Sequence, residues 1–353
     1  MEPGLERRDG ASPRRHLAVG SATLTLALAL LALVGGSLRA AVGVRRNLEA
    51  LVVTPAPSVV LAPPEAGARP AALITLPGLR PAEPGASAPV TLLILGSDRR
   101  PGEEATPRSD ALIVARLDPV GGRVALLSLP RDLWAPIPGH GSNRINSAYL
   151  WGERDGPPGA GMALARASVA NLLGIPIDYV AVADFRGFAA LVDALGGITV
   201  EVERPLEDRR FPTADRRYTT VRFAAGTQRM DGVTALTYAR IRHPDSDFER
   251  GLRQQAVLLA IAERVRERGD LANLLAAEHT SAALVGYLQT DMPAEQLLAL
   301  ALALRDLDAD HVERYALGEE DVLFGVENDR FAQRARPGVI ERYTGLLLGV
   351  PEE

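Results

Sequence analysis

Residues 90–129 read VTLLILGSDRRPGEEATPRSDALIVARLDPVGGRVALLSL, and this stretch decides the fold. It contains three short apolar runs, Val90–Leu95, Ala111–Leu117 and Arg123–Leu129, each bounded by Gly, Pro or Asp, as buried strands usually are. The turn-forming sequence Asp118-Pro119-Val120-Gly121-Gly122 separates the last two runs and predicts that they pair as a hairpin. A folded domain is therefore expected to begin near Val90 with a sheet.

Helical and extended patterns alternate in the rest of the chain. Strands that alternate with helices, some of them joined by hairpins, predict a mixed central β-sheet flanked by helices, of the α/β or α+β class. The sequence predicts further strands at 179–183, 198–202 and 312–317, and helices at 159–173, 185–195, 231–239, 251–268, 293–304 and around 336–348.

The N-terminal region carries a membrane signal. Residues 1–16 are polar, and residues 17–38 follow as 22 residues without a charge, roughly 33 Å long as a helix. The alternative is a cleaved signal peptide, whose apolar region is normally only about 7–15 residues. We therefore predict a single-pass protein of the cell membrane. It has a cytoplasmic tail at 1–16 and a transmembrane helix at 17–38, and the remainder of the chain is extracytoplasmic. Residues 39–89 are rich in Pro, Ala and Gly and predict a semi-extended linker, which leaves the folded domain at 90–350.

Composition excludes several classes of protein. The 353 residues have a formal net charge of −5, which argues against a nucleic-acid binder, since such a protein needs a basic face for phosphates. All 39 residues counted as Lys or Arg are arginine, so P-loop and Schiff-base lysines are excluded. The chain has no cysteine, and its five histidines lack metal-ligand spacing. A thiol enzyme and a zinc hydrolase are therefore not expected.

Arginine, aspartate and glutamine cluster near the ends of predicted strands, where ligands of open α/β sheets usually bind. The segments are GSDRR (96–100), RSD (108–110), PRD (130–132), YARIR (238–242) and DFERGLRQQ (247–255). A single arginine beside an aspartate is usually a surface ion pair worth about 0–1 kcal/mol. The interpretation therefore depends on the joint pattern.

Two spacings direct these side chains toward one place. Arg240 and Arg242 alternate, so on an extended segment they point the same way. Arg250 and Gln254 are spaced i, i+4, so a helix presents both on one face. Guanidinium groups bind phosphate oxygens bidentately and stay charged. The cluster therefore predicts an anion site.

Two aspartates accompany the arginines. Asp98 and Asp110 would suit a hard divalent cation, Mg²⁺ or Mn²⁺, held by one or two carboxylates together with substrate phosphates. The combined pattern predicts a diphosphate site with a metal.

The same segments carry a resemblance to a known family. The chain is similar to the LytR–CpsA–Psr family, enzymes that attach secondary polymers to bacterial cell walls. The resemblance covers about residues 90–268, in order and with closely similar spacing. The motifs are LLILGSDRR (92–100), RSDALIVARLDP (108–119), VALLSLPRDLWAPIPGHGSNRINSAY (124–149), IDYVAVADFRGFAALVDALGGITVEV (177–202), AGTQRMDGVTALTYARIRH (225–243) and DFERGLRQQ (247–255).

The resemblance implies a fold and an activity. The fold is a mixed sheet flanked by helices, with a groove that holds a polyprenyl chain. The activity is transfer of a phosphoglycan from a polyprenyl-pyrophosphate carrier to peptidoglycan, with release of polyprenyl phosphate. The polymer, for example a teichoic acid or a capsule, is not specified by the sequence.

Roles carry over residue by residue. Asp98 and Asp110 would hold Mg²⁺, and Arg131, Asp132 and Arg108 would form the catalytic set. Asp132 would orient an arginine or assist the acceptor, and Asp132 and Asp247 are both candidates for the general base. The diphosphate-binding residues implied by the resemblance are Arg100, Arg108, Arg131, Arg240, Arg242, Arg250 and Gln254.

Other readings stay open at this point. The same site could serve a glycolipid-binding regulator of the cell envelope that does no chemistry, or a pyrophosphatase that uses water as acceptor. The segment around Asn143 and Arg144 is predicted to have a structural role in a loop. The apolar spacing of Phe185, Phe188 and Leu191 is more typical of core than of a lipid-tunnel wall.

Overall fold

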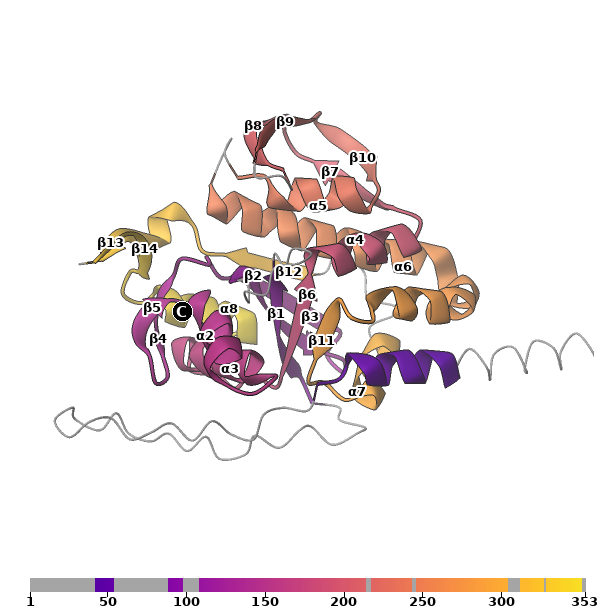
Figure 1. Ribbon diagram of the computed structural model, residues 1–353, viewed down its shortest axis with the longest axis horizontal. Coiled ribbons are helices and arrows are strands. Elements are labelled where there is room, and N and C mark those ends of the chain that lie inside the picture. Colours follow the sequence, from indigo (N-terminus) through magenta and orange to yellow (C-terminus); the bar gives the residue numbers. More distant parts are fainter. Residues whose placement is uncertain are drawn as a thin grey trace, which may run out of the picture.

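The computed structural model describes residues 42–53, 88–97, 108–213, 217–242, 246–303, 312–326 and 328–350. A six-stranded mixed sheet lies at its centre (Figure 1). In spatial order the strands are β11 (Leu288–Thr290), β6 (Tyr179–Asp184), β1 (Val90–Ser97), β2 (Ser109–Asp118), β3 (Arg123–Ser128) and β12 (Val312–Ala316). Neighbours β1 and β6, and β3 and β12, run parallel, whereas β1–β2 and β2–β3 are antiparallel. The predicted mixed sheet and its β2–β3 hairpin are thus confirmed.

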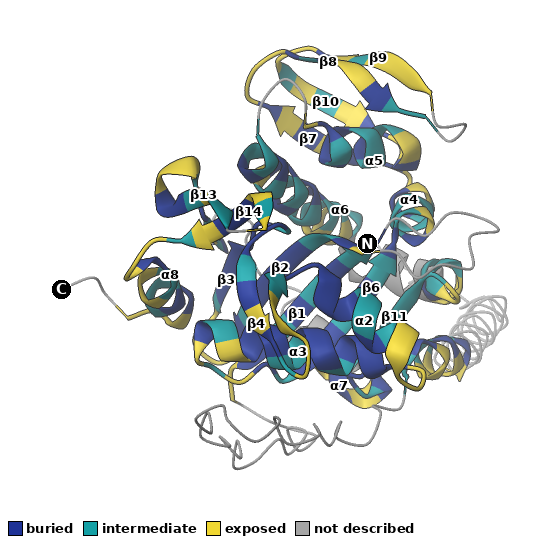
Figure 2. Cartoon of the chain, turned by 60° about the vertical axis from the view of Figure 1, so that its left-hand side comes forward, coloured by how far each residue is buried: buried dark blue, intermediate teal, exposed yellow. Residues whose placement is uncertain are grey.

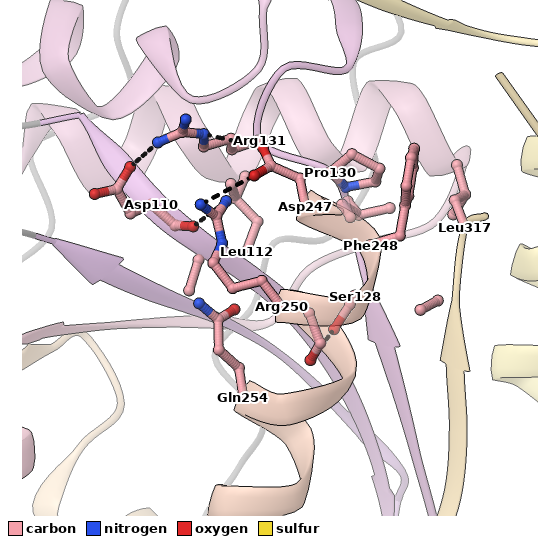
Figure 3. Close-up of a pocket in the computed structure, with 14 residues that line it drawn as sticks. Asp110, Leu112, Ser128, Pro130, Arg131, Asp247, Phe248, Arg250, Gln254 and Leu317 are labelled. Atoms are coloured by element: carbon pink, nitrogen blue, oxygen red, sulfur yellow. Dashed lines mark hydrogen bonds and ion pairs between the residues drawn. The ribbon is translucent and has the colours of Figure 1, made fainter. Parts of the chain in front are cut away.

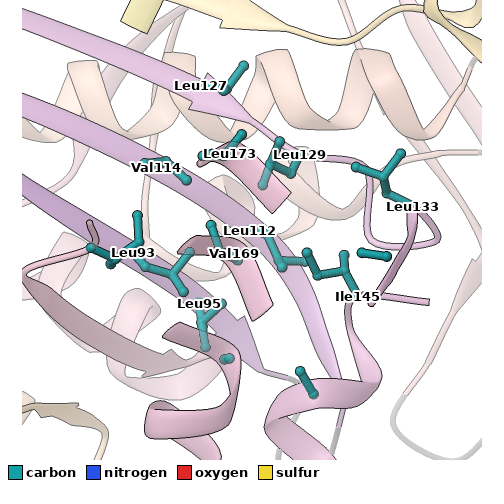
Figure 4. Close-up of a cluster of buried hydrophobic side chains, with 14 of the residues drawn as sticks. Leu93, Leu95, Leu112, Val114, Leu127, Leu129, Leu133, Ile145, Val169 and Leu173 are labelled. Carbon is teal, nitrogen blue, oxygen red and sulfur yellow. The ribbon is translucent and has the colours of Figure 1, made fainter. Parts of the chain in front are cut away.

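The central strands are buried on both faces, which explains their continuous apolar runs. Along β2, Leu112 and Val114 belong to one core and Ile113 to the opposite one, as the alternation of a strand requires. In the first core, Leu127 of β3 packs with these side chains against Val169 of an adjacent helix (Figure 4).

Helices cover both faces of the sheet. On the first face lie α2 (Ser147–Asp155), α3 (Ala160–Leu173) and α8 (Val339–Leu348). On the second face lie α6 (Asp247–Leu284) and α7 (Ala294–Ala303), which contribute Leu258, Leu259 and Leu300 to the core. Helix α6 is longer than the predicted 251–268. It begins at Asp247, after the N-cap residue Ser246, whose side chain accepts a hydrogen bond from the backbone N–H of Glu249.

A second, smaller core lies above α6 in Figure 1. It is built by α4 (Phe185–Ala194), β7 (Ile198–Val202), β8 (Leu206–Pro212), β9 (Tyr218–Phe223), β10 (Gly226–Met230) and α5 (Gly232–Arg240). Gly232 permits close packing of α5 on α4, because a Cβ there would meet the carbonyl oxygen of Ala189. Figure 2 shows the outer strand β9 largely exposed, whereas β8 also carries buried residues.

Several short elements were not predicted. They are β8, β9, β10, β11, α2, the hairpin β4 (Trp134–Ile137)–β5 (Gly141–Arg144), the hairpin β13 (Val322–Val326)–β14 (Asp329–Ala335), and the 3-10 turn η2 (Glu319–Asp321). The hairpins are rich in Arg, Asp and Gly and are buried only in part. Their apolar periodicity is therefore too weak to reveal strands.

Part of the predicted linker is folded. Residues 42–51 form a helix, and Asn47 in it donates hydrogen bonds to Ser281 Oγ (3.1 Å) and to the Glu278 carbonyl (3.2 Å). Just beyond this helix, the Val53 N–H donates to the Thr290 carbonyl at 2.7 Å. The prediction of a spacer over 39–89 is thus wrong for this segment, whose polar contacts fix it to the domain.

The predicted tail at 1–16, the predicted transmembrane helix at 17–38 and most of the predicted linker lie outside the described residues. Among the helices that the structure describes, none combines the length and the apolar character needed to cross a bilayer.

Candidate functional site

A polar pocket forms where β2 begins and β3 ends, because these antiparallel strands bring Asp110 beside the Pro130-Arg131 segment. The first two turns of α6 close it with Asp247, Arg250 and Gln254 (Figure 3). The space amounts to about 310 Å³, including a part open to solvent. Residues separated by more than a hundred positions thus face one another at one sheet edge.

Arg131 lies at the centre of three carboxylates. Its guanidinium is 2.5 Å from Asp110 Oδ1, 3.4 Å from Asp247 Oδ2 and 3.5 Å from Asp132 Oδ2. Burial by itself lowers the pKa of Arg131, but the carboxylates of Asp110, Asp247 and Asp132 outweigh it and raise this pKa above its ordinary value. The arginine is therefore held charged and fixed in direction.

Arg250 is the most deeply buried cation of the pocket, with 6% of its surface exposed. It forms an ion pair with Asp247 at 3.2 Å and donates to the backbone carbonyl of Asp110 at 3.3 Å. Burial lowers the pKa of Arg250, and repulsion from Arg131 and Arg242 acts in the same direction. An additional anion bound beside these guanidinium groups would relieve this repulsion.

Arg250 and Gln254 both line the pocket, as their i, i+4 spacing predicts. Arg253, one position away, turns instead to the carbonyl of Ile241. Gln254 makes a long 3.5 Å contact to the Ala239 carbonyl, which ties α6 to the end of α5. The predicted helical face is therefore present.

The predicted extended arrangement of Arg240 and Arg242 is wrong. Arg240 is the last residue of α5, and Arg242 follows the fully buried Ile241 outside the helix. The guanidinium of Arg240 lies 4.8 Å above the ring of Phe185 and 5.5 Å from that of Phe211. Arg242 belongs to the pocket's surroundings, because its charge lowers the pKa of Arg250.

Asp132 lies beside the pocket and is held by a second arginine. Arg144 Nη1 donates to Asp132 Oδ1 at 2.9 Å, while its Nε and Nη2 donate to both oxygens of Asp329, at 2.6 and 2.5 Å. The hydrogen bond from Arg144 is the main cause that lowers the pKa of Asp329. Sequence reasoning missed Asp329, since it lies 185 positions from Arg144 and belongs to no motif.

The remaining predicted residues divide into two groups. Arg108 is exposed and directly precedes β2, two positions before Asp110. Asp98 and Arg100 lie outside the described residues. Within the part of the chain that the structure describes, no group of three Asp, Glu or His side chains is arranged to hold a metal ion.

A larger groove runs next to the pocket, between β7, α6 and β12. It encloses about 1630 Å³, including space open to solvent. Val202, Leu252, Leu259 and Val312 supply apolar walls, while acidic and arginine side chains such as Glu201 and Arg314 also line it.

Comparison with known proteins gives consistent results. The chain is 31% identical to the regulatory protein MsrR of Staphylococcus aureus over 207 residues, which are 58% of this chain and 57% of MsrR. It is 32% identical to the polyisoprenyl-teichoic acid–peptidoglycan teichoic acid transferase TagU of Bacillus cereus over 223 residues, which are 62% of this chain and 66% of TagU. The chain thus spans less than two thirds of the length of either relative.

Solved structures share the fold. The crystal structure of Bacillus subtilis TagV superposes with a TM-score of 0.61 at 25% identity, covering 75% of this chain and 98% of TagV. TagT bound to LI-WTA gives a TM-score of 0.58 at 25% identity, covering 74% of this chain and 90% of TagT. The model of the LytR_cpsA_psr family matches residues 79–334. The chain therefore belongs to the LytR–CpsA–Psr family.

Proposed function

We propose that this protein is an extracytoplasmic phosphotransferase that moves a phosphoglycan from a polyprenyl-pyrophosphate carrier to peptidoglycan or a related wall acceptor. The observation that carries the proposal is the convergence of Arg131, Arg250 and Gln254 with Asp110 and Asp247 in one pocket. The name of TagU, a relative at 32% identity, supports this class of reaction.

The chemistry suits a site that works by charge and position. The acceptor hydroxyl oxygen bonds to the phosphorus that carries the glycan, the phosphoanhydride bond breaks, and polyprenyl phosphate leaves. Such a transfer needs neutralisation of spread negative charge more than covalent help from the protein. Arg131 and Arg250 supply fixed, poorly solvated guanidinium groups for this purpose.

A proton must leave the acceptor hydroxyl. Asp247 lines the pocket. Asp132 is outside its lining, where it contacts Arg131 at 3.5 Å and Arg144 at 2.9 Å. We therefore assign proton acceptance to Asp247 and the orientation of Arg131 to Asp132.

Asp98 and Asp110 would hold Mg²⁺ or Mn²⁺. Asp110, the member of this pair that the structure describes, lines the pocket with a carboxylate, the kind of oxygen ligand that Mg²⁺ prefers. Few protein ligands are usual for Mg²⁺, because substrate phosphates and water complete its coordination shell. When bound, the cation supplies additional neutralisation of the diphosphate.

The membrane and the lipid complete the proposal. The segment 17–38 anchors the chain, and the helix at 42–51 joins it to the domain. The prenyl chain lies in the groove of β7, α6 and β12, along Leu252 and Leu259. These two residues belong to the same helix as Arg250, so α6 contacts both the diphosphate and its lipid.

The test uses the full chain in detergent with a polyprenyl-pyrophosphate-linked glycan and Mg²⁺. Release of polyprenyl monophosphate is followed with and without peptidoglycan, for wild type, Asp98→Ala and Arg131→Ala. We expect metal-dependent release, glycan on the peptidoglycan, and a loss of at least roughly 10²-fold in both variants. Arg154→Ala, in an exposed pair with Asp155, is the matched control.

Two outcomes would contradict the proposal. Release at the same rate with and without peptidoglycan, and no glycan transferred, would favour a pyrophosphatase. Tight binding of the glycolipid without release would favour a regulator, the role that the name of MsrR describes.

A further inference from the structure

The β13–β14 hairpin presents two large apolar rings to solvent. Phe324 and Phe331 are each 59% exposed, although the chain contains only seven phenylalanines. Figure 2 shows the exposed parts of this hairpin standing clear of the buried sheet. Adjacent exposed aromatic side chains are uncommon on a surface that has no partner.

The two rings lie close together along the hairpin. Phe324 is directly opposite Gln333, and Phe331 is two residues from Gln333 on the same strand, beyond a register shift between Phe324 and Val326. Both rings are exposed, whereas Gln333 is buried. The guanidinium of Arg330 lies 4.5 Å from the centre of the Phe331 ring, which fixes that ring on one side. The exposed rings of Phe324 and Phe331 thus form a small aromatic platform on the hairpin.

The platform is joined to the pocket by direct bonds. Asp329 accepts both hydrogen bonds of the Arg144 fork, and Arg144 also binds Asp132, the neighbour of Arg131. In addition, the Gln333 N–H donates to the Asp132 carbonyl at 2.9 Å. A molecule that rests on the rings is therefore held in a fixed relation to Arg131.

We propose that this hairpin docks the acceptor, a polysaccharide strand that carries carboxylates; this inference rests on the proposed function. Aromatic faces stack on the C–H faces of pyranose rings, and the polar edges of the sugar stay in water. Arg330 and Arg334 on β14 and Arg336 just after it are exposed and match the charge of an acidic glycan.

The position in the molecule favours a glycan over a membrane. In Figure 1 the hairpin lies on the opposite side of the domain from the helix at 42–51. The hairpin is therefore remote from the described helix that lies nearest in sequence to the proposed anchor. Acceptor strands lie farther from the membrane than the lipid-linked donor and can reach this side.

The experiment compares the full-length double variant Phe324→Ala/Phe331→Ala with wild type and with Tyr218→Ala. Tyr218 lies on β9 and is 63% exposed, so it controls for the loss of an exposed ring. Three quantities are measured: co-sedimentation with insoluble peptidoglycan, the acceptor KM for transfer, and release of polyprenyl phosphate without acceptor. Flotation with anionic phospholipid vesicles tests the membrane instead.

We expect peptidoglycan binding to weaken and the acceptor KM to rise by roughly tenfold, or about 1.4 kcal/mol, in the double variant only. Release without acceptor stays at the wild-type rate, since Asp329 and its ion pair are retained. Unchanged sedimentation and unchanged KM would overturn the inference. So would weaker flotation with unchanged sedimentation, because the rings would then contact lipid.

The sedimentation arm separates this inference from the proposed function. If wild type does not transfer glycan but the double variant still loses peptidoglycan binding, the docking surface stands and the transferase fails. If wild type transfers glycan and the double variant equals it in both binding and KM, the docking surface alone fails.

Discussion

Replacement of Asp247 by asparagine separates the structural and the anion-binding roles of the pocket. The Asp247 carboxylate lies 3.4 Å from the guanidinium of Arg131 and 3.2 Å from that of Arg250. Asn keeps the shape of the side chain but removes its charge. Arg250, almost fully buried, then lacks its nearest carboxylate.

The expected loss in the free energy of unfolding follows from the contacts that remain in the variant. Loss of one partner of a fully buried ion pair costs about 3–5 kcal/mol. Here the contacts are longer than ideal, the Asp247 side chain is 18% exposed, and Asp110 still binds Arg131 at 2.5 Å. We therefore expect Asp247→Asn to lower the free energy of unfolding by about 1–2 kcal/mol, and the melting temperature by about 2–6 °C.

Inorganic pyrophosphate should reverse this loss. Removal of a negative charge beside two arginines strengthens anion binding by on the order of 1 kcal/mol at a partly solvated site, roughly fivefold. The full chain in detergent is melted over a series of pyrophosphate concentrations, and the rise in melting temperature gives the affinity. Asp155→Asn, in an exposed pair with Arg154, is expected to leave both quantities unchanged.

The reasoning would be refuted by a variant that melts like wild type, because Asp247 would then not compensate the buried arginines. It would equally be refuted by weaker pyrophosphate binding in Asp247→Asn. That result would mean that the carboxylate positions the guanidinium groups for the anion and that its repulsion of the anion is the smaller effect.

Two further predictions concern stability. Leu127→Ala, at a fully buried position of the first core, is expected to lower the free energy of unfolding in urea by about 2–5 kcal/mol, whereas Val120→Ala in the exposed turn leaves it within about 0.5 kcal/mol of wild type. Burial raises the pKa of Asp321, but donors including Gly318 N–H, Tyr343 Oη and Arg342 lower it below its ordinary value. The stability that Asp321 contributes is therefore present above about pH 4 and is lost as the pH falls through its folded-state pKa. Between about pH 5 and pH 2, the melting temperature of Asp321→Asn should fall less steeply than that of wild type. An identical fall in both proteins would contradict this assignment.

Local patterns were sufficient for the framework of the fold. The runs at Val90–Leu95 and Ala111–Leu117 became β1 and β2, because a strand buried on both faces needs an unbroken apolar stretch bounded by turn residues. Local sequence also predicted that Arg250 and Gln254 line one pocket, because their shared face depends only on the period of a helix. In these cases the information lies within a few neighbouring residues.

Local patterns failed where a distant element decided the outcome. Arg240 and Arg242 alternate like a strand, yet α5 continues to Arg240, whose guanidinium is held over Phe185 and Phe211. Residues 42–51 fall inside the predicted linker but contain no proline, and they fold as a helix that Asn47 fixes to the end of α6. In the first case a tertiary contact outweighs a weak local preference, and in the second the assignment of the whole region to a linker hid a short helical segment.

By itself, the sequence determined the mixed sheet, the family and the residue types of a charged pocket, since each is encoded in local periodicity or in contiguous motifs. Only the tertiary structure decided which charges meet: Arg131 with Asp110 and Asp247, and Arg144 with Asp329 across 185 positions. The physical reason is that an ion pair depends on the distance between side chains. Packing of separate strands and helices fixes that distance, and no local pattern in the chain records it.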